Sequence, residues 1–398
     1  MGTPIAELRE RALAALAEAL PEAVELRHRI HRDPHFGGDE APTVAELSAL
    51  LVSNNDADER SAVEVAGGLL VRSGGPGAAI AIRAELDALP IQESSDYPWA
   101  SERAGVAHLC GHDTHTAALV ATIRAVEAVG APVPLVAIFQ PREEVIPAGA
   151  IDMLAYPGLA DHDIRAVLGV HVQPVLSRGT VAAAPGPINA AADNFDIVVT
   201  GRPAHGAYPH LGRDPILAAA AIVQGLQQLV SRRIDPMRPS VVTVGSIVGG
   251  TSHNAIPSEV RIMGTLRSYD ETDQQLLHSE LATIVEAIGM AHGCEAKAEI
   301  ELGEPVLRND EDLAALVSSA LTAGGYTPAP ALKSCGADDF SFYCERYPSL
   351  MMFAGVGDGS PDSPGLHHPS FVPSDETVGE LARIMLLSYF AIAEQLDA

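Results

Sequence analysis

Cysteine, lysine and aromatic residues are all scarce in this chain of 398 residues. The four cysteines, Cys110, Cys294, Cys335 and Cys344, form no CxxC pair, and four in a chain of this length are too few for a disulfide framework. Lysine occurs only twice and aromatic residues make up 4%. Arginine therefore carries most of the positive charge, and the core must be built from alanine, valine, leucine and isoleucine.

Long apolar runs are also missing. Residues 239–258 are broken up by polar side chains, and the more apolar 215–231 contain three glutamines. Both fall short of the roughly 18 apolar residues that a membrane span needs. Near the N-terminus, Glu7, Glu10 and Glu18 interrupt the apolar positions, unlike a secretory signal. We expect a soluble, cytoplasmic protein.

The balance of charge narrows the choice of partners. The net charge is −27 and the isoelectric point is near 4.8, so the chain repels phosphate backbones and anionic lipids. We expect no nucleic-acid or membrane partner. Hydrophobic residues make up 47% and charged residues 19%, which is typical of a folded globular protein. The length predicts two or three domains.

The order of predicted elements indicates an α/β protein with an insertion. Apolar runs at 78–86, 134–140 and 166–172 are typical of strands buried on both faces, and helical segments alternate with them, which favours a mostly parallel sheet. Residues 194–302 follow the order βαββαβ of a ferredoxin-like domain. We expect an α/β domain over 1–188 and 304–398, interrupted by a small α+β domain over 189–303.

At the N-terminus, the sequence predicts two separate helices. Thr3 and Pro4 form a suitable start for an amphipathic helix that ends near Leu20. A second helical stretch carries the motif RHRIHRDPH, residues 27–35.

Two clusters of polar residues follow predicted strands, where open α/β sheets bind their ligands. In RAELDALP, Glu85 and Asp87 alternate after a strand, which a solvated turn would also explain. HLCGHDTHTAA carries Cys110, His112 and His115 in one short turn before a helix. A structural turn needs neither thiol nor imidazole, so this cluster favours a metal site over a turn.

Three further segments place potential ligands at strand ends or in loops. QPREE ends an apolar strand with Glu143 and Glu144, GVHVQP places His171 at the end of another strand, and LHHPSF carries His367 and His368. Singly, the first could be an ordinary acidic loop, the second a core histidine, and the third is a weak signal. Together, the nitrogen, oxygen and sulfur donors suit zinc, manganese, cobalt or nickel better than calcium or magnesium.

The motifs CGHDTHTA, QPREE, GVHV, GRPAHGAYPH, NAIP and LHHPSF, in this order along the chain, resemble the two-metal aminoacylase and carboxypeptidase-type metallopeptidases. More narrowly, they are similar to the amidohydrolase branch that includes hippurate hydrolase, indole-acetyl-amino-acid hydrolases and N-acyl-amino-acid deacylases. The resemblance implies a catalytic α/β domain with an inserted ferredoxin-like dimerisation domain, two divalent metal ions, a homodimer, and hydrolysis of an N-acyl amino acid.

The resemblance also implies roles for single residues. Metal ligands are expected at Cys110, His112, Glu144, His171 and His367, the last chosen over His368 because it directly follows the leucine. Glu143 is then the general base that takes a proton from a metal-bridging water, and Asp87 orients the ligands. His205 matches a histidine that the partner subunit contributes to stabilise the oxyanion, and Asn254 and Arg267 match substrate-contacting positions. A surface loop for His205 and a structural salt bridge for Arg267 are the alternatives.

Three positions depart from the pattern of the amidohydrolase branch. Glu85 replaces the usual aspartate, Asp338 replaces the usual glutamate before Asp-Phe, and Arg142 stands where a small residue is common. These departures concern substrate preference more than activity. Alternative functions are a dipeptidase or carboxypeptidase on the same scaffold, a non-catalytic binding homologue, and a redox-sensing thiol at Cys110.

Overall fold

The computed structural model describes residues 3–51, 60–360 and 363–397, which form two compact units. Unit 1 contains Met1–Gly186, Arg308–Leu332 and Phe342–Ala398, and unit 2 contains Pro187–Leu307 and Lys333–Ser341. The second unit is thus inserted into the first. The roles expected for the two domains in catalysis and dimerisation stay predictions.

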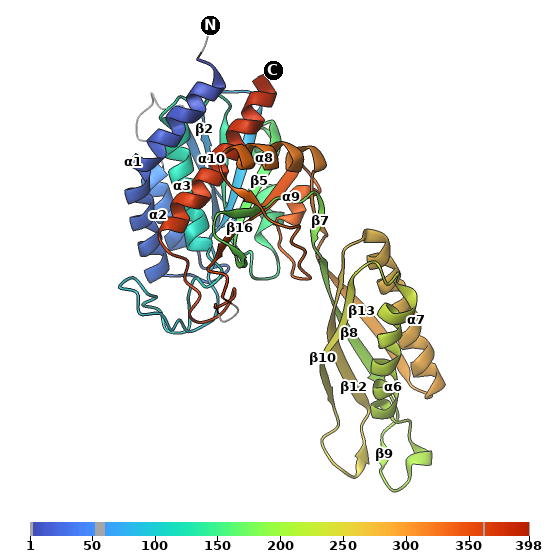
Figure 1. Ribbon diagram of the computed structural model, residues 1–398. Coiled ribbons are helices and arrows are strands. Elements are labelled where there is room, and N and C mark those ends of the chain that lie inside the picture. The colour runs from blue at the N-terminus through green and yellow to red at the C-terminus, as the bar shows by residue number, and fades with distance from the viewer. Residues whose placement is uncertain (1–2, 52–59, 361–362, 398) are drawn as a thin grey trace. The chain divides into compact units, whose positions relative to one another are not determined.

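Unit 1 is built on an eight-stranded sheet (Figure 1). Its strand order is β1-β2-β4-β3-β5-β16-β6-β15, in which β4, β3, β5 and β16 run parallel to their neighbours at the centre. All side chains of β3 and β4 are buried. The bounds of the strands are β1 Arg60–Val65, β2 Gly68–Ser73, β3 Ala79–Glu85, β4 Leu135–Gln140, β5 Ile164–Ser177, β6 Thr180–Ala182, β15 Thr327–Pro328 and β16 Ser349–Gly357.

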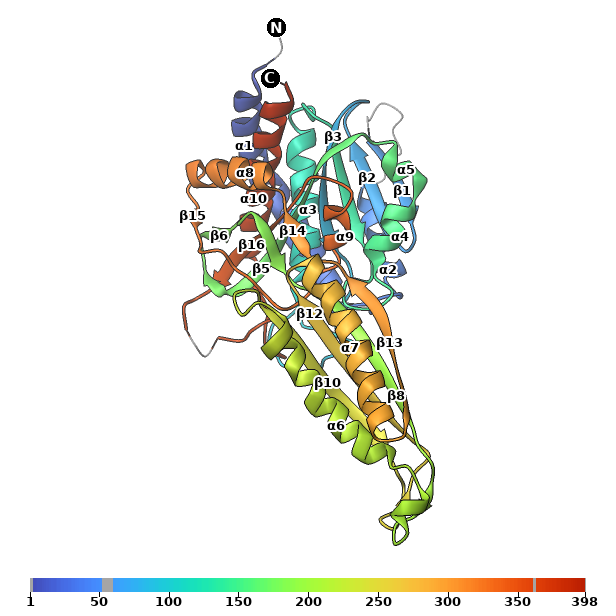
Figure 2. The ribbon, with the colours of Figure 1, turned by 90° about the vertical axis from the view of Figure 1, so that its right-hand side faces the viewer.

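Three long helices, α1, α3 and α10, lie side by side against this sheet (Figures 1 and 2). Their apolar side chains join those of the strands in one large core. This core holds the parallel strands together, so that their C-terminal ends lie along one side of the sheet. The bounds of the helices of unit 1 are α1 Ile5–Arg32, α2 Ala41–Leu51, α3 His112–Glu127, α4 Gly149–Ala155, α5 Pro157–Ala160, α8 Glu311–Ala323, α9 Ser341–Cys344 and α10 Glu376–Asp397.

The prediction of two separate N-terminal helices was wrong. A single helix, α1, continues through Pro21 to Arg32. Its buried stripe runs from Ala12 and Leu16 on to Leu26 and beyond, so packing continues on both sides of the proline. Burial of that stripe outweighs the roughly 3 kcal/mol that a proline costs inside a helix.

Unit 2 has the βαββαβ order, and its two helices cover one four-stranded antiparallel sheet of order β10-β12-β8-β13 (Figure 2). Asp214 and Asp270 cap the two helices by accepting backbone N–H groups. The elements are β8 Ala191–Thr200, β9 Ala204–His205, η1 Pro209–Leu211, α6 Pro215–Gln228, η2 Leu229–Arg233, β10 Ser240–Gly249, β11 Ala255–Ile256, β12 Glu259–Ser268, α7 Glu271–Ala291 and β13 Glu295–Glu304, with the short strands β7 Gly186–Asn189 and β14 Leu307–Asn309 where the chain passes between the units.

The fold class predicted from the sequence is confirmed: an α/β unit with a mostly parallel sheet is interrupted by a ferredoxin-like α+β unit. Within the described residues, no helix is both long and apolar enough to cross a membrane.

Candidate metal centre and active site

The turn that carries Cys110 and His112 is pressed against Val172, in the interior of β5. The prediction that the strand ends at His171 was therefore wrong, because β5 continues to Ser177. Gly111, between Cys110 and His112, has a φ of 95°, and a Cβ at this position would lie 2.6 Å from Val172 Cγ2. Only glycine fits so close an approach in this backbone conformation. As a result, Cys110 Sγ lies 3.4 Å from His171 Nε2.

Hydrogen bonds to backbone carbonyls orient both histidine rings. His112 Nδ1 lies 2.9 Å from the Asp87 carbonyl oxygen, and His171 Nδ1 lies 2.7 Å from that of Val172. A carbonyl only accepts, so Nδ1 carries a proton in both rings and Nε2 is the nitrogen left to bind a metal ion. His112 Nε2 is buried and makes no hydrogen bond to any described residue. Both rings therefore have the orientation that a metal ligand would need.

Two carboxylates and a third histidine complete the cluster. Glu143 Oε2 lies 3.9 Å from His112 Nε2, and Glu144 Oε1 lies 3.1 Å from His367 Nε2. Within each of three overlapping groups, the potential ligand atoms all lie within 4.8 Å of one another; the groups are Cys110, His112 and His171; Cys110, Glu144 and His367; and His112, Glu143 and Glu144. The structure thus brings all five predicted ligands and the predicted base together.

The loop that carries the two glutamates is held by its backbone. Arg142 has a φ of 55°, and its N–H donates to Glu40 Oε1 at 2.8 Å. The N–H of Glu144 donates to Asp87 Oδ2 at 2.9 Å. Asp87 therefore orients both this loop and the His112 ring. Glu40 is buried but was not predicted, because an acidic residue just before a helix looks like an ordinary helix start.

His367, rather than its neighbour, turns toward the cluster. Its N–H donates to the carbonyl of Leu109 at 2.9 Å, beside the Cys110 turn, and its φ is 64°. His368 Nδ1 instead lies 2.9 Å from Ser370 Oγ. The geometry therefore favours His367 as the ligand.

His115 is excluded as a ligand by its contacts. Its Nδ1 lies 2.8 Å from Glu85 Oε2, and its Nε2 accepts the N–H of Val172 at 3.1 Å. Glu85 also pairs with Arg83. Glu85, at the position that departs from the family pattern, thus belongs to a buried ionic chain behind the cluster.

The other two departures also have contacts in the structure. The Arg142 side chain pairs with Asp152, so its charge is held by a carboxylate outside the cluster. Asp338, in unit 2, accepts the N–H of Phe340 at 2.8 Å.

The electrostatics of the cluster suit cations. Burial alone would lower the pKa of His112, but the neighbouring Asp87 and Glu85 raise it to about 10. Burial and the Glu144 and Glu143 carboxylates raise the pKa of the Cys110 thiol well above its ordinary value. A site that favours protonated His112 and disfavours ionisation of the Cys110 thiol has a strongly negative electrostatic potential. Divalent cations would be stabilised by this potential and allow Cys110 to bind as a thiolate.

Three predicted residues lie in unit 2. His205 and Asn254 are neighbours, since β9 pairs with β11 and Gly206 N–H donates to the Asn254 carbonyl at 2.7 Å. Arg267 is near the C-terminal end of β12 and is half-buried. Burial raises the pKa of the Glu304 carboxyl, whereas the Arg267 charge lowers it, so a structural charge pair with Glu304 stays an alternative role for Arg267.

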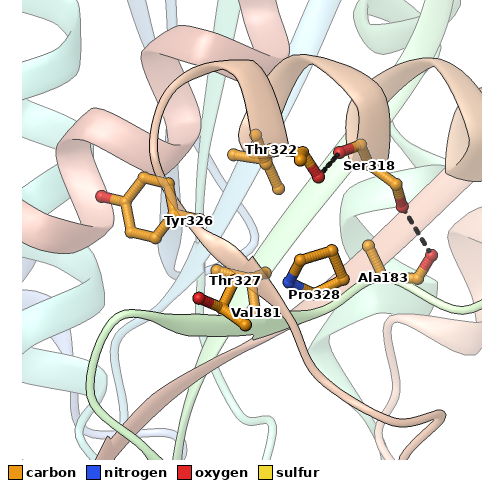
Figure 3. Close-up of a pocket in the computed structure, with 8 residues that line it drawn as sticks. Val181, Ala183, Ser318, Thr322, Tyr326, Thr327 and Pro328 are labelled. Atoms are coloured by element: carbon orange, nitrogen blue, oxygen red, sulfur yellow. Dashed lines mark hydrogen bonds between the residues drawn. The ribbon is translucent and has the colours of Figure 1, made fainter.

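A small cavity elsewhere in unit 1 does not compete with this site. It holds about 10 Å³, room for a single water. Figure 3 shows it between α8 and the strands β6 and β15, with the Tyr326 hydroxyl turned away from the other side chains. None of its lining residues belongs to the cluster.

Comparisons with known proteins agree with this geometry. Residues 81–387 match peptidase family M20/M25/M40. The chain is 34% identical over 373 residues to an N-acetyl-L-cysteine deacetylase of Bacillus subtilis, covering 93% of this chain and 86% of that protein. It is 40% identical over 239 residues to an N-acyl-L-amino acid amidohydrolase of Geobacillus stearothermophilus, covering 59% of this chain and 64% of that protein. The solved Bacillus subtilis YXEP protein, a dinuclear metal binding peptidase from the M20 family, superposes with a TM-score of 0.82 at 28% identity, covering 95% of this chain and 99% of that one.

Proposed function

The chain belongs to peptidase family M20/M25/M40, and on this premise we propose that it is a metal-dependent amidohydrolase that releases amino acids from N-acyl amino acids. The observation that carries the proposal is the cluster that lies beyond the ends of β3 and β4 and beside His171 in β5. It combines a thiol, three histidines and two adjacent glutamates within one small volume. The deacetylase and amidohydrolase relatives support the amide bond as the target.

Five residues would hold two divalent ions of manganese, zinc, cobalt or nickel: Cys110, His112, Glu144, His171 and His367. When bound, the ions lower the pKa of water and polarise a carbonyl oxygen. The donor set of sulfur, nitrogen and carboxylate oxygen supports these metals over calcium and magnesium.

Glu143 is the general base. Its Oε2 lies 3.9 Å from His112 Nε2, whereas Glu144 Oε1 lies 3.1 Å from His367 Nε2. Glu144 is thus the glutamate turned toward His367, which supports Glu143 as the one left to act on water. Glu143 takes a proton from the attacking water and returns it to the leaving nitrogen. Asp87 supports this step because it holds the backbone of the same loop at Glu144.

Arg267 and Asn254 bind the substrate, with the Arg267 guanidinium on its carboxylate. Arg267 pairs with Ala192 near the start of β8. Figure 1 shows β9 at the opposite end of the unit 2 sheet. Asn254 precedes β12, and the eight residue steps from Glu259 to Arg267 alone span about 26 Å. One small substrate therefore cannot contact both residues of a single chain.

This separation supports a homodimer that assembles through unit 2. A substrate that contacts both Asn254 and Arg267 takes them from two different chains. His205, which lies beside Asn254, then comes from the same chain as Asn254 and donates a hydrogen bond to the developing oxyanion. The outer strands β10 and β13 of the unit 2 sheet are available for such pairing. We place the dimer in the cytoplasm, with no nucleic-acid or membrane partner.

The decisive experiment measures amino acid release. N-acetyl, N-benzoyl and indole-acetyl amino acids and a set of dipeptides are incubated with chelated protein, with and without manganese, cobalt, nickel or zinc. We expect metal-dependent release from N-acyl amino acids and a loss of at least about 100-fold in Glu143→Gln, within the range attributed to a general base. Release from dipeptides alone would establish a dipeptidase. Binding of two metals without release from any substrate would indicate a binding protein.

A further inference from the structure

The motif RHRIHRDPH places a fully buried arginine behind the proposed metal centre. Arg27, on α1, is 0% exposed. Its Nε donates to Asp113 Oδ2 at 3.0 Å, one terminal nitrogen donates to Asp375 Oδ1 at 2.8 Å, and the other donates to the Pro373 carbonyl at 2.6 Å. One guanidinium therefore joins three segments of the chain that are far apart in sequence.

Two of these segments carry proposed metal ligands. Asp113 directly follows His112 in the first turn of α3. Pro373 and Asp375 lie a few residues after His367, just before α10. Arg27 thus connects the turn that holds His112 with the loop that holds His367.

His367 needs such support more than the other proposed ligands. Cys110, His112 and His171 are 6%, 1% and 7% exposed, whereas the His367 side chain is 47% exposed. Packing therefore does little to hold its ring. In addition, its φ of 64° lies in the left-handed region, a conformation that costs of order 1–3 kcal/mol and persists only when neighbouring contacts enforce it.

We propose that Arg27 is a positioning residue that clamps the loop 367–375 to the N-terminus of α3 and so holds His367 in place to bind metal. The inference rests on the proposed function, since it concerns the same metal centre. A planar guanidinium with donors in a fixed fork suits this task, because a single ammonium cannot reach all three acceptors in the same geometry.

Two further contacts stabilise the clamp. His31, one turn after Arg27 on α1, lies with its Nδ1 2.9 Å from Asp113 Oδ2 and with its Nε2 3.2 Å from the Glu93 carboxylate. Trp99 lies under the clamp, with the Arg27 guanidinium 4.5 Å from its ring centre. Because Trp99 is the only tryptophan in the chain, its fluorescence reports on this cluster alone.

The test compares two neighbouring acidic residues. Asp375→Ala removes the carboxylate that Arg27 holds and that His28 Nε2 also contacts at 2.9 Å. The Asp375 side chain is 42% exposed, so the variant leaves less buried charge uncompensated than a change at Asp113. Glu376→Ala is the matched control, because Glu376 is 79% exposed and pairs at the surface with Arg178. Arg27→Lys is the second variant, since it keeps the buried charge but loses the fork.

Manganese and cobalt binding is measured by calorimetry on the metal-free, folded proteins, with Trp99 emission recorded in the same titrations. We expect two ions in the unchanged protein and in Glu376→Ala. In Asp375→Ala and Arg27→Lys, the affinity for one ion falls about 10–100-fold, the usual effect of losing a residue that orients a ligand, and Trp99 emission shifts. Asp375→Asn, which keeps an acceptor oxygen, recovers part of the affinity.

Unchanged affinity for both ions in a folded Asp375→Ala or Arg27→Lys protein overturns the clamp. Failure of both variants to fold, while Glu376→Ala folds, also overturns it, because the contacts then serve stability rather than metal binding. These outcomes are distinct from failure of the proposed function, in which the unchanged protein itself binds no metal or releases no amino acid.

Discussion

The loop that carries Glu143 and Glu144, here called the glutamate loop, is held by Asp87. Replacement of Asp87 tests whether catalysis depends on the hydrogen bond that holds the backbone of this loop. Asp87 is 1% exposed, and its Oδ2 accepts the N–H of Glu144 at 2.9 Å. Burial alone would raise the pKa of this carboxyl, but the His112 ring, whose Nδ1 lies 3.4 Å from Asp87 Oδ1, and the backbone N–H groups of the loop lower it. Asp87 is therefore ionised at neutral pH, and its bond to the loop is charge-assisted.

The size of the effect follows from that bond. A hydrogen bond to a charged group contributes about 1.5–3 kcal/mol, and each 1.36 kcal/mol lost in the transition state lowers the rate about tenfold. Asp87→Ala should therefore lower kcat about 10- to 150-fold. Asp87→Asn keeps an acceptor oxygen without the charge, so we expect a smaller loss.

The assay is metal-dependent release of an amino acid at saturating metal, with kcat and KM determined separately. Asp152→Ala is the control, because Asp152 pairs with the side chain of Arg142 in the same loop but does not hold its backbone. An exposed ion pair contributes about 0–1 kcal/mol, so this variant should lose less than about fivefold. A kcat for Asp87→Ala within threefold of the unchanged protein would refute the argument that Asp87 holds the loop.

Three other perturbations have expected outcomes. Chelation should lower the melting temperature, because each ion held at 100 times its dissociation constant stabilises the fold by about 2.7 kcal/mol; an unchanged melting temperature in calorimetry would speak against bound metal. Burial opposes protonation of His31, but Asp113 and Glu93 raise its pKa to about 9 from 6.5, so its stabilisation is complete below pH 6.5 and is lost as the pH rises through 9. Urea titrations should show His31→Gln less stable than the unchanged protein at pH 6 and a smaller difference at pH 9.5; a constant difference would contradict this. Pro21 is exposed inside α1, so Pro21→Ala should raise the free energy of unfolding by about 1–3 kcal/mol in the same titrations, and no gain would mean that the proline costs the helix nothing.

Sequence patterns located most of the elements because their signals are local. The strands at 78–86 and 134–140 correspond to β3 and β4, the strand at 166–172 corresponds to the first part of β5, which continues to Ser177, and the βαββαβ order of the insertion is confirmed. Apolar runs and amphipathic stripes depend on neighbouring residues only, so they can be read without the tertiary structure. The prediction that a helix ends near Pro21 was wrong because it used local signals only. The packing that keeps α1 helical on both sides of Pro21 comes from α3 and α10, which are distant in sequence.

The proposed ligands, too, could be located from the sequence, because thiol, imidazole and paired carboxylates at strand ends converge in a parallel sheet. Their assignment as ligands stays a prediction. What the spacing could not reveal is how each donor is aimed. The Nε2 of His112 points into the cluster because the carbonyl of Asp87 accepts a hydrogen bond from Nδ1, the other ring nitrogen. No local sequence pattern predicts that contact.

The order of most elements, the insertion and the chemical types gathered at one edge of the sheet could thus be predicted from residue patterns. Three contacts could not: Glu40 supports the glutamate loop, His115 is bound to Glu85, and Arg27 joins Asp113 to Asp375, which lies 348 positions after Arg27. Local periodicity indicates only which face of an element is buried. The partner that a buried charge finds depends on how distant segments pack around it.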